Sequence, residues 1–359
     1  GIYSDPTQLR AVLRDKSGLP MASETVTFSV YGLTIGTAIT DAQGVAMFDY
    51  KVHVGASKAS ESSNHQIQAA ASQNNGAYYR GSEGSGVLTV GKEEALIAYT
   101  GTTVSSTMTD VTLSAQVIQQ ADGTLGDVGG LSVVFSLSRI QADGTRQPYP
   151  SHIMATEYLT DATGKATMNL RLPAGLYEVK TDLLANAYYK IAETKTILAV
   201  YDTAAGKWKA EGWYALPEGS NSFLGTSANK MHLETEWEFD QSTGLLKGKL
   251  KLHAEPNGLK LKMEQADWVV ISDQTAYVQG KAFDSQDKVY AIRLMIGNGT
   301  AADLNKAGKS VQQSDQQSGN AIASLMIWQG TDTSRNPDYQ IYGQVINGYV
   351  KFEQKNDSE

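Results

Sequence analysis

The chain of 359 residues contains no cysteine. Disulfides, thiolate metal sites and cysteine nucleophiles are therefore all excluded. No apolar run reaches about 18 residues, the length that a membrane-spanning helix needs, so no membrane span is predicted. Nucleophile elbows, phosphate-binding glycine loops and zinc motifs are also missing, and we predict that the protein is not an enzyme.

Basic residues are outnumbered by acidic ones. The 30 Lys and Arg residues face 38 Asp and Glu residues, which gives a formal net charge of -8. Because nucleic-acid binding depends on basic side chains that neutralise phosphates, no nucleic-acid partner is expected. The sequence shows no secretory leader and no sorting signal. If the protein is exported, its export signal is expected to lie outside this sequence.

A short motif occurs twice in the chain. Residues 40–46 read Thr-Asp-Ala-Gln-Gly-Val-Ala, and residues 160–166 read Thr-Asp-Ala-Thr-Gly-Lys-Ala. In each copy the Asp side chain can accept a backbone N–H in an Asx turn, and the Gly can adopt a positive φ before a strand begins. The motif therefore predicts a hairpin corner and carries no chemistry of its own.

Further matches follow the same order along both copies. Leu9, Ala11, Leu13, Phe28 and Ala77-Tyr78-Tyr79 correspond to Leu113, Ala115, Val117, Phe135 and Ala187-Tyr188-Tyr189. Apolar and polar residues alternate between turns that recur about every 8–12 residues, the pattern of a β-sandwich. The motif with its preceding strand, such as residues 26–30, resembles the tandem immunoglobulin-like repeats of large bacterial cell-surface proteins. The resemblance covers roughly residues 1 to 200, implies extracellular seven-stranded sandwiches and brings no catalytic residues.

The sequence predicts an all-β protein of three domains. Residues 1–93 form an immunoglobulin-like domain that lacks its first strand, because the second copy has an apolar strand at about residues 95–104 and the first copy has no equivalent. We therefore expect a fragment of a longer protein, with that strand upstream or donated by a neighbour. Residues 94–201 form a complete immunoglobulin-like domain. Residues 202–359 contain all five tryptophans and form a C-terminal β-sandwich or jelly-roll-like domain, similar to a β-domain found after such repeats in bacterial secreted proteins.

Charges of opposite sign alternate along two neighbouring segments of the third domain. Glu234, Glu236 and Glu238 would share one face of a strand, and Lys247, Lys249 and Lys251 one face of the next. A hairpin loop at residues 241–244 would place Glu238 opposite Lys247, Glu236 opposite Lys249 and Glu234 opposite Lys251. With a third strand at residues 259–264, Lys247, Lys249, Lys251, Lys260 and Lys262 form either a patch for acidic wall polymers or a solvated face balanced by glutamates.

Other candidate ligand residues are aromatic or acidic. Trp208 and Trp213 are flanked by Lys, Glu and Gly and are the candidates for stacking on sugar rings, whereas Trp237 and Trp268 are predicted core residues. No cofactor is predicted, and calcium is the one metal that the acidic turns could bind. Its candidate ligands are Asp122, Asp127, Asp284 and Asp287, for which turn formation is the alternative. The polar segment that follows Gly297-Asn298-Gly299 and ends near Gly319 shows no strand pattern. It is either a mobile loop or a binding lid, and its composition favours a mobile loop.

These features predict a structural, adhesive segment of a bacterial extracellular, cell-surface or surface-layer protein, acting as a semi-rigid stalk. Its expected partners are other copies or modules of the same protein, together with cell-wall polysaccharide. The first alternative is a polysaccharide-binding module in which the third domain is the binder. The second is an accessory region of a secreted hydrolase.

Overall fold

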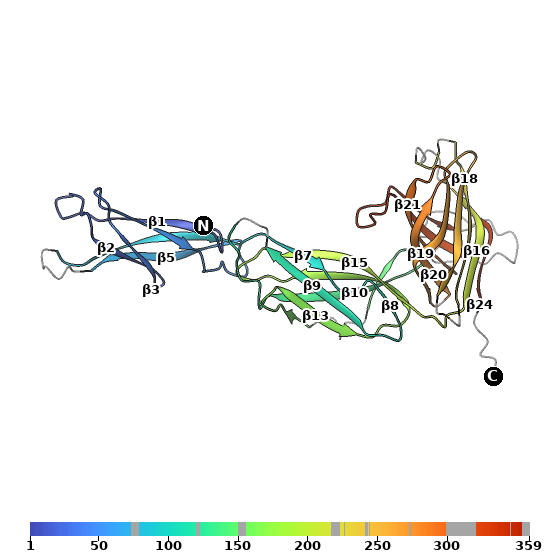
Figure 1. Ribbon diagram of the computed structural model, residues 1–359, viewed down its shortest axis with the longest axis horizontal. Coiled ribbons are helices and arrows are strands. Elements are labelled where there is room, and N and C mark those ends of the chain that lie inside the picture. Colours follow the sequence, from blue (N-terminus) through green and yellow to red (C-terminus); the bar gives the residue numbers. More distant parts are fainter. Residues whose placement is uncertain are drawn as a thin grey trace.

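Three β-assemblies follow one another along the chain in this computed structural model (Figure 1). The structure describes residues 1–72, 79–119, 123–149, 156–216, 223–225, 227–240, 243, 245–272, 274–298, 321–344 and 346–353. Two sandwiches lie end to end, and the third assembly stands at the far end with its strands turned across the long axis (Figure 1). All named elements in these ranges are strands, so the predicted all-β fold class is confirmed.

The first sandwich packs a sheet of two strands against a sheet of four. The small sheet consists of β1 (Pro6–Val12) and β4 (Val45–Lys51), and the large one has the order β3 (Leu33–Ile39), β2 (Thr25–Val30), β5 (Ser62–Ala71) and β6 (Ser82–Gly91). Alternate side chains of each strand point into the space between the sheets, where Leu9, Phe28 and Val90 are buried.

The second sandwich has the strand order of an immunoglobulin-type domain. One sheet has the order β13 (Lys165–Leu170), β9 (Val111–Gln119) and β7 (Ala95–Tyr99). The other has the order β11 (Arg146–Pro148), β10 (Ser132–Ile140), β14 (Gly175–Leu183), β15 (Ala192–Tyr201) and β8 (Val104–Ser106), with β12 (Tyr158–Leu159) also paired to β10. Leu113, Phe135 and Tyr177 are among the side chains buried between the sheets.

The strands after Tyr201 form one sheet of nine. Their order is β23 (Tyr339–Gln344), β22 (Ala321–Gln329), β21 (Val289–Asn298), β20 (Thr275–Phe283), β19 (Lys260–Ser272), β18 (Leu246–Glu255), β17 (Lys230–Phe239), β16 (Lys207–Ala215) and β24 (Ile346–Glu353). The sheet curls around a single core, in which Trp208 of β16 lies in the same cluster as Ile341 of β23 (Figure 1). The expected sandwich or jelly roll needs two sheets, whereas the described strands after Tyr201 form one sheet, in which β16 to β23 pair in sequence order and β24 pairs with β16.

The repeated motif forms the predicted corner. In the first sandwich Asp41 Oδ1 accepts the backbone N–H groups of Gln43 and Val45, both at 2.9 Å. In the second sandwich Asp161 makes the corresponding two bonds, at 2.8 and 3.0 Å. Gly44 has a φ of 75°, which places it in the left-handed region that glycine adopts at little cost. The motif therefore works as a structural corner in both copies.

The third assembly contains the same corner without the motif. Asp284 Oδ1 accepts the backbone N–H groups of Gln286 at 2.8 Å and Lys288 at 3.0 Å. The position that glycine holds in the sandwiches is held by Asp287, with a φ of 59°. Asp is one of the few residues other than glycine that tolerates this region, and so the corner does not show in a search for the repeated motif.

Tyr3 joins the first sandwich to the second. Although it precedes β1, its side chain is buried in the core of the second sandwich. Its ring centroid lies 4.7 Å from that of Tyr188 and 5.6 Å from that of Tyr189. The backbone N–H of Asp127 donates to the Tyr3 hydroxyl at 3.3 Å. One aromatic side chain thus fixes the end of the first sandwich against the second.

A separate buried cluster joins the second sandwich to the nine-stranded sheet. It consists of Ile140, Leu176 and Ala199 from the sandwich and Trp268, Val270, Tyr277 and Met295 from the sheet. The Tyr277 hydroxyl donates to the Ile140 carbonyl at 2.7 Å, and Arg139 Nη2 donates to Ser272 Oγ at 2.7 Å. Residues 268–271 of β19 are all buried, because the sheet core lies on one face of the strand and the sandwich on the other.

Candidate functional site

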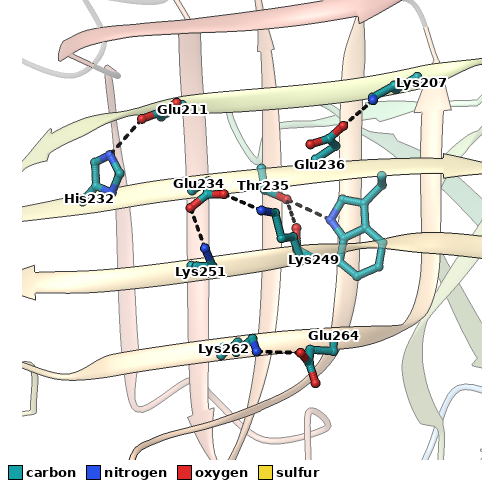
Figure 2. Close-up of polar contacts among 11 residues, drawn as sticks. Lys207, Glu211, His232, Glu234, Thr235, Glu236, Lys249, Lys251, Lys262 and Glu264 are labelled. Atoms are coloured by element: carbon teal, nitrogen blue, oxygen red, sulfur yellow. Dashed lines mark hydrogen bonds and ion pairs between the residues drawn. The ribbon is translucent and has the colours of Figure 1, made fainter.

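The outer face of β16 to β19 carries a regular array of charged side chains (Figure 2). In β17 the odd-numbered residues, such as Trp237, point into the core, and in β18 the even-numbered residues, such as Leu250, do so. The charged residues of both strands point outward. The backbone pairs Glu238 with Lys247, Glu236 with Lys249 and Glu234 with Lys251, and the predicted hairpin register is therefore confirmed.

The ion pairs between these side chains do not follow the cross-strand pairing of the backbone. The Glu234 carboxylate lies between two amines, 2.7 Å from Lys249 Nζ and 3.0 Å from Lys251 Nζ (Figure 2). Glu236 instead forms an ion pair with Lys207 on β16. Long Lys and Glu side chains reach diagonal neighbours as easily as direct ones, and the result is a lattice across several strands.

The two ends of this lattice are closed by further ion pairs. Lys247 Nζ lies 2.5 Å from Asp240 Oδ2, at the end of β17, and Lys262 Nζ lies 2.6 Å from Glu264 Oε1 on β19. Lys260 is exposed at the start of β19, opposite His253. The five predicted lysines thus do gather on two neighbouring strands, with four of them bound to carboxylates, an arrangement that favours a charge-balanced face. Sequence reasoning missed Lys207 and Asp240 as members, although the outward position of Lys207 follows from the alternation along β16.

A shallow hollow of about 540 Å³ lies within the lattice. It is lined by Glu236, Glu238, Lys247, Gly248, Lys249, Lys251, Lys262 and Glu264. Both signs of charge and several hydrogen-bond donors and acceptors surround it. Such a surface can bind a polar or zwitterionic group, because amines and carboxylates are available within one side-chain length of each other.

The two lysines beside Glu234 lower the pKa of that carboxyl group, chiefly through the hydrogen bond from Lys249 and then that from Lys251. A carboxylate whose pKa is lower in the folded state adds stability above its unfolded pKa and loses it as the pH falls through the folded pKa. We expect the melting temperature to fall more steeply below about pH 4.5, with about 1–3 °C of that fall due to Glu234.

Thermal unfolding followed by circular dichroism between pH 7 and pH 3 measures this effect. Glu234→Gln cannot titrate and should flatten the acid limb of the curve, whereas Glu83→Gln, on an exposed position of β6, should leave it unchanged. Equal acid limbs in both variants and in the unaltered chain would show that Glu234 is not linked to folding.

Some of the predictions for the tryptophans are correct and one is wrong. Trp237 and Trp268 are core residues, as predicted, at 1% and 6% exposed. Trp208 was predicted to be available to a ligand, and this is wrong: it is 0% exposed, because it shares the inward face of β16 with Ala210 and Tyr214. Trp213 is half-buried on the outward face of the same strand.

The surroundings of Trp213 limit what its ring can bind. Lys230 Nζ lies 4.3 Å from the ring centroid in a cation–π contact, and the ring of His232 lies 4.6 Å away. A sugar ring that stacks on the face of Trp213 covered by Lys230 would have to displace that lysine.

The acidic candidates for calcium lie apart. Asp284 and Asp287 share one turn, where Asp284 Oδ1 is already occupied by two backbone N–H groups. Asp127 Oδ1 accepts the backbone N–H of Gly129 at 2.8 Å in the second sandwich. Asp122 lies outside the described residues, as does most of the Gly297–Gly319 segment. Within the described ranges no group of three or more His, Asp or Glu side chains is placed to hold a metal ion, and no helix is long and apolar enough to cross a membrane.

Comparison with known proteins identifies no family. No family model matches the sequence, and no curated protein matches it. Among solved structures, the fibronectin(III)-like modules of Clostridium thermocellum CbhA are similar at 14% identity and a TM-score of 0.22, over 56% of this chain and 88% of that one. Extracellular domains 3–5 of Drosophila OTK are similar at 12% identity and a TM-score of 0.25, over 73% and 91%. Escherichia coli alpha-2-macroglobulin is similar at 12% identity and a TM-score of 0.28 over 98% of this chain, which spans 26% of that protein.

Proposed function

We propose that this chain is a non-enzymatic structural segment of a bacterial extracellular or surface-layer protein, a semi-rigid stalk that holds the nine-stranded sheet at one end. The observation that carries the proposal is the pair of buried junctions. Tyr3 ties the first sandwich to the second, and the cluster around Trp268 ties the second to the sheet. A spacer of this kind keeps its length, because each hinge would have to expose buried apolar area in order to bend.

The regular corners and the charged outer face support the same function. Both sandwiches use carboxylate-capped corners such as that at Asp161, which need no cofactor to form. Adhesive contacts are assigned to the nine-stranded sheet, with other modules of the same surface protein as partners. The proposed location is the cell surface or the extracellular space.

Distances measured between spin labels test the stalk directly, and the absence of cysteine means that introduced cysteines are the only labelling sites. The pair Ser85→Cys and Lys165→Cys spans the first junction, and Lys165→Cys with Gln286→Cys spans the second; all three positions are exposed. We expect single narrow distance distributions across both junctions. The matched control, Thr37→Cys with Ser85→Cys, lies within one sandwich. Distributions much broader than that of the control would contradict a semi-rigid stalk.

A second candidate, a polysaccharide-binding module, is favoured by the charged hollow over β17 to β19. Acidic wall polymers would contact Lys251 and Lys262, which lie directly opposite each other on β18 and β19. A glycan and cell-wall polymer array probed with the full chain tests this candidate. Retention that is lost in Lys251→Gln/Lys262→Gln would favour the binding module, and no retention on any polymer would favour the stalk alone.

A further inference from the structure

Arg293 is a buried cation on the outer face of the nine-stranded sheet. In β21 the side chains of Ile292 and Leu294 lie in the sheet core, whereas Met295 lies in the cluster shared with the second sandwich, and Arg293 alternates with the core residues onto that same outer face. Only 9% of the Arg293 surface is exposed. A buried charge is costly to remove from water, so a guanidinium in this position is normally paired with a carboxylate.

Within the described ranges, no carboxylate pairs with Arg293. Its Nε–H donates to Gln279 Oε1 at 2.7 Å, and its guanidinium carbon lies 5.2 Å from the centroid of the Trp328 ring. Gln279 lies directly opposite on β20, and the Trp328 ring is held by a hydrogen bond from its indole N–H to the Arg335 carbonyl at 2.9 Å. Both partners of Arg293 are uncharged, and its positive charge is therefore left uncompensated.

The free edge of the Arg293 guanidinium reaches the surface. In the part of the chain that the structure describes, the N–H groups on its two terminal nitrogens have no acceptor, and neither nitrogen is fully enclosed. These N–H groups form the fork that can bind both oxygens of a carboxylate. The small exposed part of Arg293 thus includes the edge that an anion would use.

A hairpin of the second sandwich packs beside Arg293. Residues 141–145 connect β10 to β11, and a Cβ atom added at Gly144 would lie 3.9 Å from Ser324 Oγ on the outer face of β22. Two residues further along is Arg146, the first residue of β11. Burial, and then the charge of Arg146, lower the pKa of Arg293 to about 10, so both arginines are cations at neutral pH. The two arginines come from different assemblies and act on the same place.

Glu178 neutralises Arg146 but forms no ion pair with Arg293. Arg146 Nε donates to Glu178 Oε2 at 2.7 Å, and about half of the Arg146 side chain is exposed. The carboxylate of the hairpin itself, Asp143, accepts the Thr145 backbone N–H at 2.8 Å and caps its own turn. One positive charge, that of Arg293, therefore remains, and a single negative charge would balance it.

We propose that Arg293 and Arg146 form a binding site for the carboxylate group of a small organic acid, at the junction between the second sandwich and the nine-stranded sheet. The terminal N–H groups of Arg293 bind both carboxylate oxygens, and Arg146 adds its positive charge from the exposed side. The rest of the acid points past Arg146 into solvent. A monoanion is favoured over a phosphate dianion, because one charge is uncompensated. The site does not depend on the stalk function, since either could exist without the other.

Nuclear magnetic resonance of the full chain, labelled isotopically in its arginine side chains, tests the site directly. The Nε–H signal of Arg293 is identified by its Overhauser contacts to the Trp328 ring, which lies against the guanidinium. Sodium acetate is the probe, and sodium chloride at the same concentration is the reference. We expect acetate to shift this signal saturably, with a dissociation constant in the millimolar range, and chloride to leave it almost unchanged.

Three variants keep the Arg293 reporter and change the charge around it. Arg146→Gln should weaken acetate binding by about threefold or more, because it removes the second cation. The matched control is Arg171→Gln, which removes an exposed arginine of the same sandwich that pairs with Asp110, and it should leave acetate binding unchanged. Glu178→Gln should strengthen acetate binding, because it leaves the charge of Arg146 uncompensated.

Three outcomes would overturn the proposal. One is an Arg293 signal that moves equally in acetate and in chloride, which would show only screening by salt. Another is an equal loss of acetate binding in Arg146→Gln and Arg171→Gln. The third is inorganic phosphate that displaces acetate and binds more tightly, which would show a site for a tetrahedral dianion instead.

Discussion

Replacing Trp268 with alanine is expected to uncouple the nine-stranded sheet from the second sandwich. Trp268 is 6% exposed and belongs to the cluster that also contains Leu176 and Tyr277. Truncation of a buried tryptophan costs about 3–5 kcal/mol, and here most of that loss falls on contacts between the two assemblies. Calorimetry should show the sheet and the second sandwich unfolding in separate transitions, and small-angle scattering should show a more flexible particle.

The matched control for this variant is Trp213→Ala. Trp213 is half-buried on the outward face of β16, with Lys230 and His232 around its ring, and it is absent from the junction cluster. It should lower stability less and leave the particle shape unchanged. If both variants gave the same scattering profile as the unaltered chain, the cluster around Trp268 would not be what holds the two assemblies together.

Replacing Gly248 with alanine is expected to destabilise the nine-stranded sheet by about 2–4 kcal/mol. A Cβ atom at this position would lie 2.2 Å from the Glu236 carbonyl oxygen and 2.4 Å from Cε3 of Trp237. Trp237 is buried directly opposite Gly248 and its indole N–H donates to Thr235 Oγ1 at 2.8 Å, so the ring has little freedom to move. Urea unfolding followed by tryptophan fluorescence measures the loss.

The control for Gly248 lies in the same sheet. Gly343 in β23 has no atom within 4 Å of an added Cβ, and Gly343→Ala should change the free energy of unfolding by less than about 1 kcal/mol. Similar stabilities for the two variants would mean that the Trp237 ring moves aside to admit the methyl group.

The charged lattice shows how far alternation along a sequence can lead. The register of Glu234, Glu236 and Glu238 against the three lysines follows from a period of two and a short loop, and it is correct. Which carboxylate each lysine binds does not follow, because Lys207 comes from β16 and reaches Glu236 from the other side. Strand order across a sheet is a property of the whole fold.

The burial of Trp208 could have been predicted from the spacing of the apolar residues in its strand. Its neighbours Lys207 and Lys209 suggested an exposed position, yet Trp208, Ala210 and Tyr214 are two or four residues apart and share the buried face. In a strand the next residue lies on the opposite face, so adjacent charges say nothing about exposure. The alternation of apolar residues along β16 predicts the burial of Trp208 correctly.

The junctions could not be found from the sequence. The hydroxyl of Tyr277 binds the carbonyl of Ile140, 137 residues earlier, and no local pattern links the two. The apolar run at residues 268–271 predicts burial and does not say against what. Only the three-dimensional fold shows that Val269 and Ile271 pack in the core of the sheet, whereas Trp268 and Val270 pack against the second sandwich.

The pairing of β16 with β24 has a mechanical consequence. The chain enters the nine-stranded sheet at Lys207, which lies opposite Glu353 at the end of β24. The first residue of β16 and the last residue of β24 are therefore neighbours in the antiparallel pair. A pull between these residues opens their backbone hydrogen bonds one pair at a time. In the second sandwich β8 runs parallel to β15, and a pull along the rod loads the bonds between them together, in shear. Under tension the sheet should therefore peel open at β24 while the sandwich still holds.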